Sequence, residues 1–409
     1  MSSLPVACPA VEHWRYPFAV DDPFLLPSEF EVLRREQPIA RVRMASSGDP
    51  VYLVTRYEDV RAVLSDQRFS RNLARPDTAR MIDGVRQPSS PFADPPVHTR
   101  WRRLVSRAFT ARRVEAMRPR VAQIVDGLLD AIEQAGPPAD MMEQLAFPLP
   151  IAVVCTVLGI EPDRHRQVRD FARIALSTDA DTSGEDRISS YEGMVGHVTD
   201  LIQAKREEQD DDLLSWLIAV HDDDDGDALS DQELLATTMT LLIGGYENTA
   251  HQIGKSIQTL LAHPQHLGAL REEPVGMAGR MVEETLRYSG AIDSGYGSPR
   301  YATEDVEVGG VVIPRGATVL VIRASANRDP DQFADPDRFD PSRDPSQHLT
   351  FGIGPHFCLG APLARLEMET AFVALARRFP TLRLGVPADD VVWAFRLTAA
   401  GPAALPVTW

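Results

Sequence analysis

The hydrophobic pattern of the chain is mostly that of amphipathic helices, with a few short strands. Apolar residues recur at helical spacing from about residue 96 to residue 264 and again from about residue 274 to residue 288. Residues 39–44 and 50–55 read as strands on either side of the turn-forming Ala-Ser-Ser-Gly-Asp, and residues 306–314 carry two central glycines. Each pattern predicts a β-hairpin. We therefore expect a mainly α-helical fold with small β-sheets.

One predicted helix is much longer than the others. Ser230 and Glu233 have the spacing of a capping box, and no proline follows until Pro264. A helix of about thirty residues is ~45 Å long at 1.5 Å per residue. A helix of this length is expected to cross the middle of the molecule.

Composition places the chain among large globular proteins. It has 409 residues, of which 44% are hydrophobic, enough for a sizeable core. No linker of biased composition and no repeat separates it into parts, so we expect a single domain over residues 1–409. The formal net charge of −17 argues against nucleic acid as a general partner, because phosphate backbones require a positive surface.

The three cysteines and the hydropathy indicate the compartment. Cys8, Cys155 and Cys358 are far apart and odd in number, which favours neither a disulfide framework nor a zinc site. The first residues lack the basic and apolar regions of a signal peptide, and the longest apolar stretch is too short to span a bilayer. A soluble cytoplasmic protein without a membrane partner is expected.

Cys358 stands among three glycines, Gly352, Gly354 and Gly360, just before a predicted helix. A sulfur at that place meets unpaired backbone N–H groups and the positive end of the helix dipole, and both favour the thiolate. The glycines leave room for a flat, bulky group to approach the backbone. The alternative is a buried cysteine packed as a small hydrophobe, which is the commoner fate of a lone cysteine.

The stretch Phe-Gly-Ile-Gly-Pro-His-Phe-Cys-Leu-Gly, residues 351–360, resembles the haem-binding loop of the cytochrome P450 family. It matches every fixed position of the pattern Phe-Gly-x-Gly-x-His-x-Cys-x-Gly, and companion motifs extend the resemblance over nearly the whole chain. The resemblance implies a P450 fold with haem b (iron protoporphyrin IX) between a long central helix and the helix after this loop. It makes Cys358 the proximal thiolate ligand of the iron, with Phe351, Gly352, His356 and Gly360 as further cofactor-binding residues.

A second motif places Glu284 and Arg287 three residues apart on one helical face, and Asp-Pro-Asp-Arg-Phe adds Arg338. By resemblance these three form a buried Glu–Arg–Arg cluster that holds the cysteine loop. An exposed pair at this spacing, the simpler interpretation, would contribute only ~0.2–0.5 kcal/mol.

Haem carries two propionates, and a protein that buries them must supply hydrogen-bond donors. His98 and Arg102 are four residues apart on a predicted helix, and Arg300 lies in a predicted strand. With His356, all four match positions that contact propionates in the family.

The long helix contains Gly244 and Gly245, each costing ~1 kcal/mol in a helix interior, and space above the iron would explain them. Relatives carry an acid followed by a threonine here, which relay protons during oxygen activation. This chain has Glu247 but Asn248, and the adjacent Thr249 points about 100° further round the helix. Glu247, Asn248 and Thr249 are the predicted catalytic residues.

Electrons must come from elsewhere, because no dinucleotide or flavin fingerprint is visible. The resemblance implies a ferredoxin or flavodoxin with its NAD(P)H-dependent reductase. A local basic cluster is a candidate docking face, although a solvated arginine face would look the same. Its members are Arg100, Arg103, Arg107, Arg112 and Arg113.

The family's substrate-lining segments correspond to positions of mixed polarity: Leu241, Gly244, Gly245, Ile292, Asp293, Ser294 and Thr398. They suggest a mid-sized, mainly apolar substrate such as a polyketide, terpenoid or cyclic peptide product, and the scarcity of lysine suggests a bacterial source with specialised metabolism. Three functions stay open: a monooxygenase that hydroxylates or epoxidises, a haem-thiolate enzyme that couples radicals to form a C–C or C–O bond, and a non-catalytic haem sensor.

Overall fold

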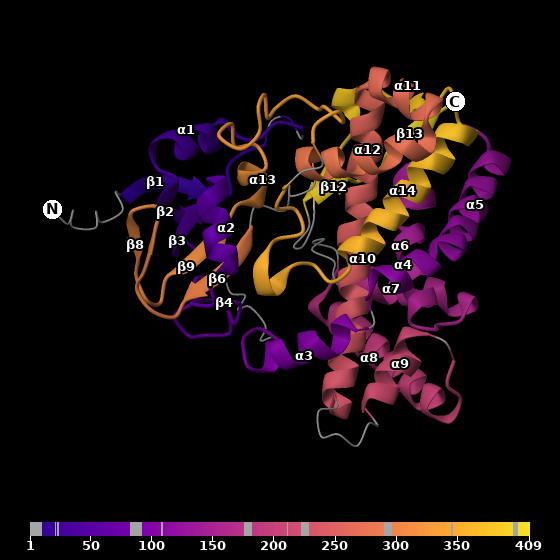
Figure 1. Ribbon diagram of the computed structural model, residues 1–409, viewed down its shortest axis with the longest axis horizontal. Helices are drawn as coiled ribbons and strands as arrows, with labels where there is room; N and C mark the ends of the chain where they lie inside the picture. The colour runs from indigo at the N-terminus through magenta and orange to yellow at the C-terminus, as the bar shows by residue number, and fades with distance from the viewer. Residues whose placement is uncertain are drawn as a thin grey trace. The chain divides into compact units, whose positions relative to one another are not determined.

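The structure is a computed structural model that describes residues 10–20, 22, 24–81, 92–107, 109–175, 182–210, 212–221, 229–289, 297–344, 347–395 and 400–409 (Figure 1). Contacts within the chain define two compact units. The first comprises Met1–Arg100 and Glu283–Cys358, and the second comprises Trp101–Val282 and Leu359–Trp409. The expectation of a single domain over residues 1–409 stays a prediction.

The first unit is built on a six-stranded sheet with the order β1-β2-β3-β9-β6-β4. Its strands are β1 (Ala10–Tyr16), β2 (Ile39–Met44), β3 (Pro50–Val54), β4 (Phe69–Ser70), β6 (Ser298–Ala302) and β9 (Thr318–Val321). The pairs β1–β2 and β3–β9 are parallel and the others are antiparallel. The predicted hairpin of β2 and β3 is confirmed, with Ile39 opposite Val54.

The second predicted hairpin is also confirmed, as β7 (Val306–Val308) and β8 (Val311–Ile313). Gly309 and Gly310 have φ of 52° and 79°, the left-handed region that glycine enters without a steric cost. The helices of this unit are α1 (Ser28–Glu36), α2 (Tyr57–Ser65), α13 (Arg323–Ala326) and the 3-10 turn η3 (Gly354–His356). Two further helices, α3 (Val97–Ser106) and α12 (Pro274–Ser289), run across the border between the units.

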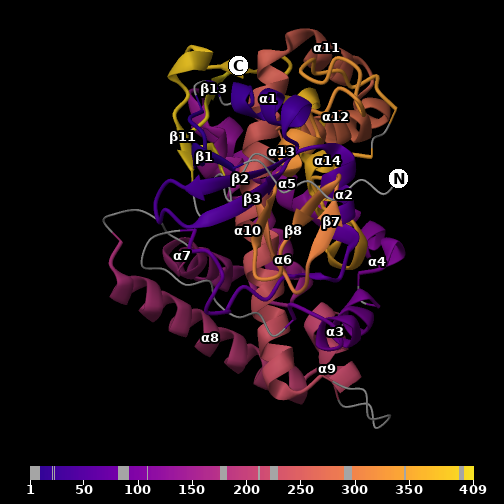
Figure 2. The same ribbon diagram turned by 90° about the vertical axis from the view of Figure 1, so that its left-hand side faces the viewer.

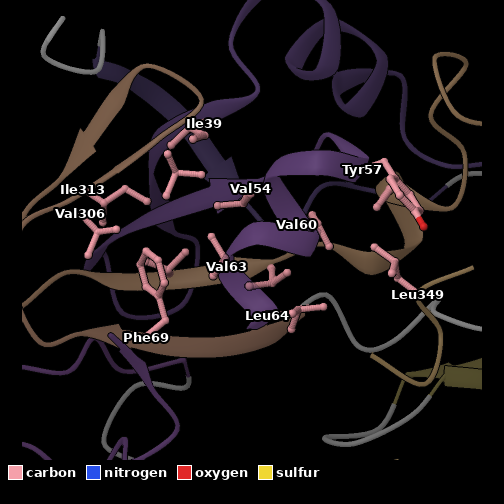
Figure 3. Packing of buried hydrophobic residues seen from close by; sticks show 14 of the residues in the cluster. Ile39, Val54, Tyr57, Val60, Val63, Leu64, Phe69, Val306, Ile313 and Leu349 are labelled. Atoms are coloured by element: carbon pink, nitrogen blue, oxygen red, sulfur yellow. The ribbon is translucent and has the colours of Figure 1, made fainter. Parts of the chain in front are cut away.

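An apolar core joins α2 to the sheet of the first unit (Figure 3). Val60 and Val63 of α2 pack in one cluster with Val54 of β3, and all three are fully buried. Burying such a side chain contributes ~1.5–3 kcal/mol relative to leaving it exposed. Leu349, 2% exposed, belongs to the same cluster. The core therefore reaches the start of the cysteine loop.

The second unit is mainly helical (Figure 2). Its helices are α4 (Ala111–Ala116), α5 (Arg118–Ala135), α6 (Pro148–Val157), α7 (His165–Ala175), α8 (Gly184–Glu207), α9 (Leu213–His221), α10 (Asp231–Ala262), α11 (Pro264–Glu272) and α14 (Ala361–Arg378), with the short helices η1 (Met142–Ala146), η2 (Pro162–Arg164) and η4 (Ala388–Asp390). The small sheets consist of β5 (Ala139–Asp140), β10 (Arg383–Leu384) and β13 (Pro406–Thr408), and of β11 (Trp393–Phe395) with β12 (Ala400–Pro402).

The predicted long helix is α10, of 32 residues. Both hydrogen bonds of the capping box form: Glu233 N donates to Ser230 Oγ, and Ser230 N donates to the Glu233 carboxylate. Every residue from Ala250 to Leu260 is buried, so this part of α10 has no solvent-exposed face. Helix α6, helix α8 and strand β12 pack against it. Among the described helices, none is both long and apolar enough to cross a bilayer.

Candidate functional site

The cysteine loop, residues 351–360, is held in a tight turn by hydrogen bonds between backbone groups. Cys358 N donates to Phe351 O at 2.9 Å, and Gly352 N donates to Leu349 O at 2.9 Å. Gly352 and Gly354 have φ of 71° and 73°, so both are glycine because of the left-handed backbone. A Cβ added to Gly354 would also lie 3.1 Å from Cα of Ser65. The loop therefore turns tightly and packs directly against the end of α2.

Cys358 and Cys155 have opposite environments. Cys358 is exposed, whereas Cys155 is fully buried in α6. Burial raises the pKa of the Cys155 thiol to about 12, so this residue stays a neutral thiol. The alternative of a cysteine packed as a small hydrophobe therefore describes Cys155 and not Cys358. The flanking Gly360 has open space around a Cβ that would be added to it.

A buried ion pair anchors the segment before the loop. Arg287 and Glu284 are 1% and 4% exposed, and they form two parallel hydrogen bonds of 2.8 and 2.7 Å. Arg287 also donates to the carbonyl oxygens of Asn327, Pro336 and Arg338. The Glu284–Arg287 pair of the predicted cluster is thus buried and fully hydrogen-bonded, which is the condition under which a buried ion pair is tolerated.

The third member of this cluster was predicted wrongly. The Arg338 side chain is 65% exposed and pairs with Asp340, so Arg338 contributes only its backbone oxygen to the cluster. Arg343 takes the place instead: its Nε lies 3.3 Å from Glu284 Oε1, and its side chain is 15% exposed. The physical reason is that Arg343 also donates to the backbone oxygens of Ala334 and Asp335, which hold its guanidinium inward.

A chain of hydrogen bonds links this cluster to the cysteine loop. Asn327 O accepts from Arg287, and the Asn327 side chain accepts from Leu349 N at 2.7 Å and donates to Thr350 Oγ1 at 2.9 Å. Thr350 in turn donates to Leu286 O at 2.6 Å. Leu349 and Thr350 directly precede Phe351, so the Glu284–Arg287–Arg343 cluster positions the loop through two intervening residues.

Arg300 lies in a second cluster of charged groups in the first unit. It is 5% exposed, and burial together with the positive charges of Arg71 and Arg323 lowers its pKa to about 9, against the opposing effect of Asp94. In the described part of the chain, the charges that act on Arg300 are two guanidinium groups and one carboxylate, so with Arg300 itself the cluster holds three positive charges and one negative charge. The cluster thus has two positive charges in excess and is suited to bind an anion of two negative charges.

The two histidines predicted to contact propionates lie together. The rings of His98 and His356 are in contact, with their centroids 4.0 Å apart and their planes inclined by 40°, and His98 is 3% exposed. Arg71 Nη1 lies 3.4 Å from His356 Nδ1, so the histidine pair adjoins the arginine cluster. Arg102, the fourth predicted residue, belongs to the second unit. Arg71, Asp94, Arg323 and Arg343 were missed from the sequence because no motif includes them.

On α10 the two glycines have different surroundings. A Cβ added to Gly244 would meet nothing within 4 Å, whereas one added to Gly245 would lie 3.2 Å from Val154 of α6. Gly245 thus permits the close approach of two helices, and Gly244 leaves an open face. Leu241 and Asn248 share the face of Gly244 by their spacing, and Asn248 is exposed.

The acid beside Asn248 is oriented differently. Glu247 is 6% exposed, and Thr249 is half-buried. One turn further along, His251 is buried against the Phe147 ring, with the ring centroids 5.4 Å apart. The other predicted pocket residues, Ile292, Asp293, Ser294 and Thr398, lie outside the described residues.

Four arginines of the predicted redox-partner face are exposed on α3, on α4 and between them in the second unit: Arg103, Arg107, Arg112 and Arg113. The Arg113 guanidinium lies over the Trp216 ring at 5.2 Å from its centroid. Arg100 is half-buried and belongs to the first unit.

Comparison of the chain with known protein families identifies its family. The family described as Cytochrome P450 matches residues 26–177 and 185–386. The chain belongs to the cytochrome P450 family. This P450 is 45% identical over 397 residues to nocardicin C N-oxygenase of Nocardia uniformis subsp. tsuyamanensis, covering 96% of this chain and 98% of the relative. It is 43% identical over 390 residues to 6-deoxyerythronolide B hydroxylase of Saccharopolyspora erythraea, covering 92% and 94%.

A solved structure confirms the fold. The crystal structure of the LnmA cytochrome P450 hydroxylase from the leinamycin biosynthetic pathway of Streptomyces atroolivaceus S-140 is 41% identical, with a TM-score of 0.87, and the match covers 97% of this P450 and all of that chain. The predicted family, fold class and cofactor are therefore confirmed. This P450 is a haem-thiolate oxidoreductase, and its cofactor is haem b.

The residues around Arg300 and the cysteine loop fit this cofactor. The two excess positive charges around Arg300 match the two propionates of haem, and the open surroundings of Gly360 and the exposure of Cys358 suit a flat group beside the sulfur. Haem supplies the oxygen-activating chemistry when it is bound. Cys358 would supply the thiolate and the arginines around Arg300 the cations for the propionates, while the buried Glu284–Arg287–Arg343 cluster supports the loop.

Proposed function

We propose that this P450 is a monooxygenase that inserts one oxygen atom from O₂ into a mid-sized, mainly apolar specialised metabolite by hydroxylation or epoxidation. The observation that supports it best is the similarity over nearly the whole chain to three P450s named for an oxygenation, on nocardicin C, on 6-deoxyerythronolide B and in the leinamycin pathway. Cys358 ligates the iron, with Phe351 and Gly360 beside it. Arg300, His98, His356 and Arg102 bind the propionates.

The substrate is expected on the open face of α10. Leu241 gives that face an apolar contact, and Gly244 leaves it without a side chain at its centre. Asn248 adds an amide that both donates and accepts hydrogen bonds. An apolar molecule with a few polar groups suits this combination.

Electrons are proposed to come from a ferredoxin or flavodoxin with an NAD(P)H-dependent reductase. The exposed arginines of α3 and α4 form a locally positive surface on a protein whose net charge is −17. An acidic redox partner would be steered toward such a surface, and the steering would weaken with salt.

A second candidate function is radical coupling without oxygen insertion, and Asn248 is the observation that favours it. Asparagine lacks the hydroxyl that threonine supplies in the proton relay of relatives, and a coupling reaction would depend less on that relay. Glu247 is retained beside it, and an acid at this place has little purpose without protons to deliver, so oxygen insertion is the function we favour.

An optical titration against a panel of specialised metabolites tests the proposal, because a substrate that enters the site changes the haem spectrum. Each binder is then incubated with a ferredoxin, its reductase and NAD(P)H, and the product mass is measured. A gain of one oxygen atom supports the monooxygenase. A dimer or a ring closure that has lost two hydrogen atoms supports coupling, and no NAD(P)H use with any binder would leave only haem binding.

A further inference from the structure

Arg71 is a charged residue that no motif of the chain includes. It follows β4, whose Ser70 pairs with Tyr301 of β6, so the sheet brings Arg71 next to the strand that carries Arg300. Asp94 holds this point of the chain: its carboxylate accepts a hydrogen bond from Arg71 N at 3.0 Å and another from the Ser70 hydroxyl. The backbone of Arg71 is therefore fixed independently of its side chain.

The Arg71 side chain points to the cofactor-binding groups of the first unit. Its Nη1 lies 3.4 Å from His356 Nδ1, and its charge acts on Arg300. The side chain is accessible to solvent, and partial desolvation together with the charge of nearby Arg323 lowers its pKa. A guanidinium can only donate, so Nδ1 of His356 accepts and its Nε2 carries the proton.

We propose that Arg71 binds a haem propionate directly, and that it also positions His356 so that Nε2–H donates to the same carboxylate. This inference rests on the placement of the propionates at Arg300 and His356 proposed above. Asp94 offsets only part of the positive charge, because it is one carboxylate beside Arg71, Arg300 and Arg323. A propionate at this place would pair with Arg300 and Arg71 as a charge-assisted acceptor.

The test is the rate at which holoprotein transfers haem to an excess of apomyoglobin. Arg71→Gln is expected to lose haem roughly 10-fold to 100-fold faster, the effect of a charge-assisted hydrogen bond. Arg71→Lys keeps the positive charge, so its rate of haem loss should lie between those of Arg71→Gln and the wild type. Arg68→Gln is the matched control, because Arg68 is exposed and its guanidinium pairs with Asp66 and Glu304.

A second measurement separates propionate binding from a general effect on the fold. Wild type and Arg71→Gln are reconstituted with haem dimethyl ester, whose propionates carry no charge. If Arg71 binds a propionate, the substitution has little effect on loss of the ester. Equal acceleration for haem and for the ester would overturn the inference and leave a purely structural role.

The variant Arg300→Gln distinguishes failure of the proposal about Arg71 from failure of the proposed propionate site at Arg300. If Arg300→Gln accelerates haem loss and Arg71→Gln does not, the inference about Arg71 is wrong and the propionate site at Arg300 stands. If neither substitution accelerates it, the propionates lie elsewhere and both proposals fail.

Discussion

Replacing Glu284 with alanine should destabilise the protein and weaken the buried cluster that supports the cysteine loop. Glu284 Oε1 accepts from Arg287 Nη2 at 2.7 Å, from Asp340 N at 2.8 Å and from Arg343 Nε at 3.3 Å, and Oε2 accepts from Arg287 Nε at 2.8 Å. Glu284→Ala removes the one carboxylate that these two guanidinium groups share. Breaking a buried pair costs about 3–5 kcal/mol, a large part of the stability of most domains.

The assay is the yield of soluble haem-loaded protein together with urea unfolding followed by circular dichroism. Glu284→Ala should give little holoprotein, and whatever is recovered should unfold at a much lower urea concentration than the wild type. A normal yield and an unchanged unfolding midpoint would refute the reasoning, because they would show that the two guanidinium groups tolerate the loss of their counter-charge.

Arg338 and Arg343 provide a matched comparison, because each ends a segment of the pattern Asp-Pro-x-Arg. Arg343→Ala removes a half-enclosed guanidinium that donates to Glu284 and to backbone oxygens, and it should cost about 1.5–3 kcal/mol. Arg338→Ala removes an exposed pair with Asp340 and should cost less than about 1 kcal/mol. The reverse order of the two midpoints would contradict the assignment of Arg343 to the cluster.

Three further outcomes are expected. Cys358→Ser should abolish the red-shifted Soret band of the ferrous-CO complex that thiolate ligation gives, and an unchanged band would refute ligation by Cys358. Arg103→Glu with Arg107→Glu should slow reduction by an acidic ferredoxin and flatten its dependence on ionic strength, and unaltered kinetics would place the docking face elsewhere. Asn248→Ala should lower the ratio of product to NAD(P)H consumed and raise hydrogen peroxide, whereas an unchanged ratio would remove Asn248 from proton delivery.

Each of these substitutions has a control in the chain. Cys155→Ala, in the buried α6, should leave the ferrous-CO band as it is. Glutamate at Arg377 and Arg383, both exposed on the second unit, changes the net charge equally and should leave reduction by ferredoxin unaffected. Asn248→Thr restores the hydroxyl of the family pattern and should couple at least as well as the wild type.

Local patterns sufficed for the secondary structure around the site. The capping box at Ser230 marks the start of α10, and the paired glycines at Gly309 and Gly310 mark the turn of a hairpin, because each signal depends on a few neighbouring residues. The alternation of residues 39–44 likewise identified β2. These elements are determined by interactions within a few residues of one another, which a sequence displays directly.

The inward arginine of the Glu284 cluster could not be read from the sequence. Residues 335–338 and 340–343 both have the pattern Asp-Pro-x-Arg, so either arginine could face Glu284. The choice depends on which backbone oxygens each guanidinium meets, and these come from the folded course of residues 334–338. The contribution of Arg71 was hidden for a similar reason, since it arises from the pairing of β4 with β6, whose strands are more than 200 residues apart.

The supports of the cysteine loop explain why its position is set by the first unit itself. Leu349 packs into the apolar core of α2 and the sheet, while the amide of Asn327 holds the backbone of Leu349 and the hydroxyl of Thr350. Both supports therefore act immediately before Phe351, and the bond from Cys358 N to Phe351 O closes the loop from that point. Because Asn327 is itself tied to Arg287, loss of Glu284 should release the polar support and leave the apolar one. A Glu284 variant that folds partially should then retain the sheet but bind haem weakly, because the sulfur no longer has a fixed place.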